Sequence, residues 1–209
     1  MSEARFTEVF TQLILLDIAG ADRHELIADA AAASAGCLHE AMAASDEPPA
    51  NWEAWLAGGH MRKSVRKASC AVLEAAAALE GSVRAGRAVA LAPELIGALP
   101  SKIRRTQVSG WSVGADPART APDAGAPGLH VVLEQSLQMS TGKACAQAAH
   151  AAVMAAEAGQ WAPGTPVHVH ERTLGEADTK GTPRRIAVRD AGLTEVAAGS
   201  LTCVAYPRR

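Results

Sequence analysis

Residues 128–159 constrain the fold more than any other part of the chain, because they predict a buried strand followed by a long helix. The segment opens on a short apolar run, which is long enough for a buried strand. Ser140 and Thr141 can then accept hydrogen bonds from the unpaired amides of a first helical turn. From Lys143 to Ala158 almost every residue is a helix former, and the many alanines let this helix lie close to a sheet.

Three polar residues stand out against this alanine background. Lys143, Gln147 and His150 are spaced i, i+4 and i+7, so all three project from one stripe of the helix. A lysine in the first turn is disfavoured by the helix dipole, by a few tenths up to about 1 kcal/mol. Either Lys143 is solvated and has no role, or it is held there to meet an anion, and the spacing alone does not choose.

A second segment, residues 190–205, is a turn-rich stretch between two short apolar runs. Together with residues 129–150 it resembles the type-2 peptidyl-tRNA hydrolases, a family best known from archaea and eukaryotes and also found in bacteria. The matching motifs are Gly142-Lys143-Ala-Cys-Ala-Gln147-Ala-Ala-His150-Ala151, then Asp190-Ala-Gly-Leu-Thr194-Glu195 with Gly199-Ser200-Leu-Thr202. Taken alone, an Asp that precedes a Gly at the end of a strand, as in Asp190-Ala-Gly, is a common turn former. The two motifs in the family's order favour a functional site, and the resemblance covers residues 129–209.

The resemblance implies an α/β fold, with a small mixed four-stranded sheet flanked by helices. The expected strands are residues 129–134, 166–173, 184–189 and 201–206. It also implies an enzyme that cleaves the ester bond between peptide and tRNA in peptidyl-tRNA and so recycles tRNA, with no metal and no organic cofactor. The residues carried over as catalytic are Lys143, Asp190 and Thr194, and those carried over as substrate-binding or supporting are Gln147, His150, Ser200 and Thr202.

The chain departs from the family pattern in two ways. Residues 174–183 are too short for the helix that normally joins the second and third strands, since a parallel crossover needs a dozen or more residues. We therefore expect the helix predicted at 60–79 to cover the open sheet face instead. Glu134, Ser136 and Glu195 replace expected residues, and the two acids would repel phosphate. An alternative is therefore a binding or regulatory protein on the same scaffold, without catalysis or with another substrate.

The rest of the chain predicts a mostly helical N-terminal region at 1–110, with helices near residues 4–18, 21–44 and 60–79. A linker rich in Ala, Gly, Pro and Asp follows at 111–127, and the hydrolase-like domain occupies 128–209. The sequence shows no internal repeat. The third helix would carry a basic cluster on its outer side, which is either a solvated face or a contact with substrate phosphates. Its members include Arg62, Lys63 and Arg66.

Charge and composition predict which part of the chain binds a polyanion and in which cell compartment the protein works. Residues 1–59 hold 10 acidic and 2 basic residues, whereas residues 60–209 hold 12 acidic and 18 basic, so a polyanion should bind the second part. Four scattered cysteines fit buried thiols in a reducing compartment. His168 and His170 alternate on a predicted strand, but the sequence identifies no further metal ligands. We expect a cytoplasmic protein, without a signal peptide or membrane span, from a GC-rich bacterial genome. An acidic N-terminal surface that forms a homodimer or partner interface is compatible with either function.

Overall fold

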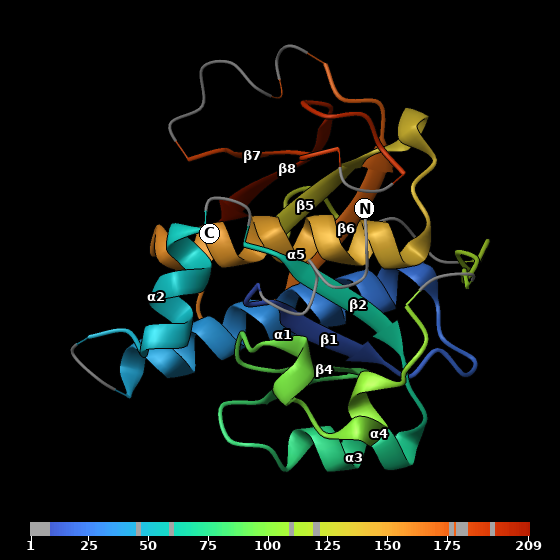
Figure 1. The fold of residues 1–209 in the computed structure, drawn as a ribbon. Coiled ribbons are helices and arrows are strands. Elements are labelled where there is room, and N and C mark those ends of the chain that lie inside the picture. The colour runs from blue at the N-terminus through green and yellow to red at the C-terminus, as the bar shows by residue number, and fades with distance from the viewer. Residues whose placement is uncertain are drawn as a thin grey trace.

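The computed structural model describes residues 9–44, 47–58, 61–108, 111–118, 122–175, 178, 184–192 and 195–209. Each half of the chain forms a four-stranded sheet, and two long helices lie side by side between the sheets (Figure 1). Among the described helices, none has the length and apolar character needed to cross a bilayer.

The C-terminal half contains the predicted mixed sheet. Its strands are β5 (Gly128–Glu134), β6 (Val167–Arg172), β7 (Ile186–Arg189) and β8 (Leu201–Arg208), in the order β6-β5-β8-β7. β6 runs parallel to β5, and β8 runs antiparallel to both β5 and β7. The long helix α5 (Thr141–Glu157) follows β5, as the alanine-rich segment predicts. The α/β fold with a small mixed sheet is therefore confirmed.

The N-terminal half contains a second sheet that the sequence did not predict. Its strands are β1 (Gln12–Leu16), β2 (Lys63–Lys67), β3 (Val83–Ala85) and β4 (Ala88–Ala90), and its long helix is α1 (Arg23–Ala43). The order is β2-β1-β4-β3, with β2 parallel to β1 and β4 antiparallel to both β1 and β3. This is the topology of the C-terminal sheet. The further helical elements are α2 (Ala50–Ala57), α3 (Cys70–Ala77), α4 (Ser101–Arg104) and the 3₁₀ turns Ile96–Ala98 and Gln135–Leu137.

The chain thus has an internal structural repeat without a sequence repeat. In each half six residues, 17–22 and 135–140, join the first strand to the long helix. Strand order and direction depend on which positions are apolar and on loop lengths, and many different residues satisfy both requirements. The same fold can therefore recur where the sequences no longer resemble each other.

Two of the predicted N-terminal helices are wrong. Residues 12–16 form β1, and all five are buried because helices cover both faces of this sheet. A central strand buried on both faces gives a continuous apolar run, which periodicity alone does not separate from a short buried helix. The segment predicted as a helix at 60–79 is instead β2 followed by α3, with residues 59–60 outside the described part. The helix predicted at 21–44 is confirmed as α1.

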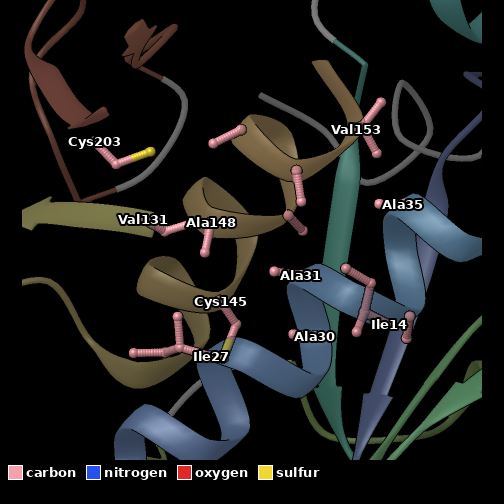
Figure 2. Close-up of a cluster of buried hydrophobic side chains, with 14 of the residues drawn as sticks. Ile14, Ile27, Ala30, Ala31, Ala35, Val131, Cys145, Ala148, Val153 and Cys203 are labelled. Atoms are coloured by element: carbon pink, nitrogen blue, oxygen red, sulfur yellow. The ribbon is translucent and has the colours of Figure 1, made fainter. Parts of the chain in front are cut away.

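The two halves pack through α1 and α5, which run side by side between the sheets (Figure 1). The contact is made of small side chains, among them Ala31 and Cys145, which are fully buried where the two helices meet (Figure 2). Small side chains at these positions let the two backbones lie close together. The N-terminal half does pack on the C-terminal half, mainly through α1 and also through β2 against α5. The prediction that residues 60–79 cover the open face of the C-terminal sheet is wrong, since α3 contacts β4 and α4.

The face of the C-terminal sheet opposite α5 carries both polar rings and apolar side chains, and His130, Val132 and Val204 on it are almost fully buried. Along β5 and β6, Leu129, Val131 and Val169 belong to the core, so the alternate side chains point to the other face. There His130 lies between other rings, with centroid distances of 5.2 Å to His170 and 5.4 Å to Tyr206. No α-helix occurs among the described residues between β6 and β7.

Candidate functional site

Lys143 and Asp190 meet at the start of α5. The Ser140 side chain caps this helix by accepting a hydrogen bond from the Lys143 amide at 3.2 Å, as predicted from the sequence. The Lys143 ammonium forms an ion pair with Asp190 Oδ2. The two side chains are only 11% and 4% exposed, so this pair lies at the edge of the protein interior. The pair brings the two sequence motifs into one site.

The turn between β7 and β8 fixes the Asp190 backbone. Its amide donates to Ser200 O at 3.0 Å, and its carbonyl accepts from the Gly199 amide at 2.8 Å. Asp190 Oδ1 accepts from the Gly192 amide at 2.7 Å. Gly192 has φ +75° and a side chain there would meet Ala198, so this position requires glycine. Ser200 therefore supports the turn through its backbone.

Gln147 and Thr202 hold the other side of the carboxylate. Gln147 Nε2 donates to Asp190 Oδ2 at 2.9 Å, and Gln147 Oε1 accepts from the Thr202 hydroxyl at 2.6 Å. Gln147 is 3% exposed and Thr202 is fully buried. The structure places these two predicted substrate-binding residues behind Asp190, where they set the orientation of its carboxylate.

His150 lies farther along α5, where this helix meets β2 of the N-terminal half. Burial, together with the positive charges of Lys63 and Lys143, holds the pKa of His150 well below its usual value. The imidazole is therefore neutral at pH 7. Thr194, the third predicted catalytic residue, is outside the described residues.

The basic cluster predicted on an outward helical face is wrong, because its members lie on or beside β2. Lys63 Nζ donates to Gln12 Oε1 at 2.8 Å and lies 4.3 Å from the centre of the Trp55 ring. Burial lowers the pKa of Lys63 well below its usual value. Arg66 is 7% exposed and donates to Arg104 O at 2.8 Å. Arg62 precedes β2, and its carbonyl accepts from the Gln12 amide.

The two unusual acids are bound to backbone amides near the site. Glu195 accepts from the Ser140 amide at 3.0 Å and from the Ser140 hydroxyl at 2.5 Å. Glu134 accepts from the amides of Ser136 and Leu174 at 2.8 and 2.7 Å. Burial opposes ionisation of Glu134, but these hydrogen bonds hold its pKa below the usual value. Both carboxylates are thus used in local structure.

Sequence reasoning missed two contacts that come from outside the motifs. The Trp111 ring lies against the first turn of α5, where a side chain at Gly142 would approach it to 3.3 Å. Arg23, the first residue of α1, donates to Thr141 Oγ1 at 3.0 Å. No periodicity or motif in the sequence links either residue to Lys143, since both depend on the packing of the two halves.

The N-terminal half carries an ion pair of opposite polarity at the equivalent place. Glu25 is the third residue of α1, as Lys143 is of α5. Arg87 lies in the short turn between β3 and β4, and its Nε lies 3.4 Å from Glu25 Oε1. Its amide donates to Asp29, the seventh residue of α1, as Gln147 is of α5. Of the two equivalent places, the C-terminal one carries the lysine on the helix and the carboxylate on the turn.

This arrangement suits a reaction in which negative charge develops beside an ammonium group. A fixed cation stabilises an oxyanion, and a carboxylate held by three donors can orient a water molecule. Among the described residues, no group of three or more His, Cys, Asp or Glu side chains is arranged to hold a metal ion.

One comparison with known proteins finds a match, and it lies in the C-terminal half. Searches among curated proteins and among solved structures find no match to this chain. Residues 128–207 match the family model described as peptidyl-tRNA hydrolase PTH2, and this segment contains β5, α5, Lys143 and Asp190. The resemblance predicted for residues 129–209 is therefore confirmed as a match of residues 128–207, a segment of the 209-residue chain, to the PTH2 family model.

Proposed function

We propose that this protein hydrolyses the ester bond that joins a peptide to tRNA, releasing the peptide and free tRNA. The observation that carries the proposal is the ion pair between Lys143 and Asp190. The pair joins side chains 47 residues apart in the chain at the start of one helix. The match of residues 128–207 to the PTH2 family supports the same reaction.

In the proposed reaction, water attacks the ester carbonyl and the bond to the ribose oxygen breaks. Lys143 stabilises the negative charge of the tetrahedral intermediate, because its ammonium is already in place and needs no reorganisation. Asp190 orients the attacking water, and the donors on both carboxylate oxygens fix its direction. Thr194 is proposed to position the attacking group.

The remaining polar residues act by holding Asp190 in place. Gln147 donates to the Asp190 carboxylate and is itself held by Thr202, and the Ser200 carbonyl accepts a hydrogen bond from the Asp190 amide. We propose that the protein acts in translation in the cytoplasm, where peptidyl-tRNA is formed. Glu195 accepts from the amide and hydroxyl of Ser140, the cap of α5, and its negative charge is favoured at this N-terminal end of the helix dipole.

The test is release of tRNA from purified peptidyl-tRNA, measured as initial rate on the full-length protein. We expect turnover by the wild type, reduced by about a hundredfold in Lys143→Ala and in Asp190→Asn, the order seen when a donor or base is lost. Arg84→Ala is the matched control, since Arg84 forms an exposed ion pair with Glu74 in the N-terminal half. Its rate should equal that of the wild type.

Other outcomes would refute the hydrolase proposal. Wild-type protein that binds peptidyl-tRNA without releasing tRNA would instead support a binding or regulatory role on this scaffold. Salt-insensitive or absent tRNA binding would exclude both, because contacts with phosphates are salt-dependent.

A further inference from the structure

The turn that precedes Lys143 is anchored by a residue from the other half of the chain. Arg23 begins α1 and lies outside the segment that matches the hydrolase family. Its Nη1 donates to Thr141 Oγ1 at 3.0 Å, and its Nη2 donates to Met139 O at 2.8 Å. Thr141 is fully buried and Met139 is 5% exposed. One guanidinium therefore fixes the backbone just before the lysine.

Glu171 at the end of β6 completes this anchor. It accepts from Arg23 Nη2 at 2.9 Å and lies 3.1 Å from His24 Nε2. Hydrogen bonding from His24, and then from Arg23, lowers the pKa of Glu171 to about 2 against the opposing effect of burial. The carboxylate is therefore ionised at neutral pH and balances the guanidinium, so Arg23 ties together α1, β6 and the start of α5.

The same turn is held on its other side by the loop that carries Asp190. Glu195 accepts from both the amide and the hydroxyl of Ser140, and Ser140 Oγ accepts from the Lys143 amide. Residues 139–141 thus lie between two anchors, one from each half of the chain. The first turn of α5 takes its position from both.

We infer that Arg23 is a positioning residue, which sets the place of Lys143 relative to Asp190 through the turn at 139–141. The inference rests on the proposed hydrolase function. Removing the guanidinium leaves the buried Met139 carbonyl without this donor, and the turn then relaxes to find another. Thr141 Oγ1 loses one donor and keeps the Val113 amide at 3.0 Å. A shift of about 1 Å at a reacting group can reduce a rate by about a hundredfold.

A lysine at position 23 should replace Arg23 only in part. Its ammonium is a compact point charge, whereas the planar guanidinium presents five donors in a fixed fork. The structure uses this fork to reach Glu171, Thr141 and Met139 together. A single ammonium can keep the ion pair with Glu171, but it cannot keep all three contacts at these distances.

The first experiment measures kcat and KM for peptidyl-tRNA with full-length Arg23→Met, Arg23→Lys and the control Arg84→Met. We expect kcat to fall by about 10- to 100-fold in Arg23→Met with KM changed by less than about threefold. Arg23→Lys should fall between Arg23→Met and wild type, and Arg84→Met should match wild type. All assays are run well below the unfolding temperature of each variant. A folded Arg23→Met with wild-type kcat would overturn the inference.

The second experiment does not depend on activity. Hydrogen exchange of the amides of residues 143–145 should accelerate by about tenfold or more in Arg23→Met and not in Arg84→Met. If the wild type shows no turnover, the hydrolase proposal fails, and faster exchange would still support positioning of this turn by Arg23. Exchange at these amides equal to wild type would overturn the positioning role, whatever the result of the activity assay.

Discussion

Replacing Glu171 by glutamine should cost much more stability than replacing an exposed glutamate that also pairs with an arginine. Glu171 pairs with Arg23 where the two halves meet, and the side chains are 22% and 12% exposed. Glu74 pairs with Arg84 at 2.6 Å in the N-terminal half, and these side chains are 60% and 42% exposed. Both are glutamate–arginine pairs, but the Glu171 pair is more buried and Glu171 also pairs with His24.

The magnitude follows from the pKa of Glu171, which falls from 4.5 to about 2 in the folded protein. Since one pKa unit corresponds to about 1.36 kcal/mol, ionisation of Glu171 contributes about 3 kcal/mol to the free energy of unfolding. A lowered folded-state pKa gives stability that is fully present above the unfolded value and lost as pH falls through the folded value. The contribution should therefore be complete at pH 7 and fall to about half near pH 3.

The assay is urea unfolding of wild type, Glu171→Gln and Glu74→Gln at pH 7 and pH 3. Glu171→Gln should lower the unfolding free energy by about 3 kcal/mol at pH 7, and this difference from wild type should shrink by about 1.5 kcal/mol at pH 3. Glu74→Gln should cost less than about 1 kcal/mol. Equal losses for the two variants at pH 7, or a Glu171→Gln loss independent of pH, would refute the reasoning.

Three further predictions concern the site and the core. Gly192→Ala should lower the free energy of unfolding in urea by roughly 1–3 kcal/mol and reduce turnover, because φ at this position is +75° and the new Cβ would lie 2.7 Å from the Ala198 Cβ. Unchanged stability of this variant would contradict the geometry. Thr202→Val should cost roughly 1–3 kcal/mol in the same assay by leaving Gln147 Oε1 without its donor, and a neutral effect would mean that the acceptor finds water. A thiol reagent should label Cys70 rapidly in the native protein, and rapid labelling of a second thiol would be inconsistent with the core. The buried thiols, whose pKa burial raises, are Cys37, Cys145 and Cys203.

Local sequence was sufficient to predict an element when the residues of one segment specify its secondary structure. The helix α5 has strong helix formers and a serine cap, and the structure places its start at Thr141, one residue after Ser140. The four strands of the C-terminal sheet were expected from the family resemblance, but their order came only from the structure, since pairing between distant strands has no local signal. The contact of Lys143 with Asp190 was expected on the same basis, and the geometry agrees.

The N-terminal sheet was missed for a physical reason. β1 is a five-residue apolar run buried on both faces, which fits a buried helix as well as a buried strand. β2 carries Lys63 and Arg66, whose charges suggested a solvated surface. Their stems and charged ends instead lie among protein atoms, where carbonyl, hydroxyl and ring partners compensate for lost water.

The sequence by itself determined the α5 helix, its cap, and the lysine and aspartate of the two motifs that resemble the hydrolase family. Only the tertiary structure decided that the N-terminal half repeats the topology of the C-terminal half, and that Arg23 binds the turn beside Lys143. Helix formation and capping depend on neighbours within a few residues, so they can be read along the chain. The packing of α1 on α5 depends on small side chains far apart in the sequence, whose contacts exist only after both halves fold.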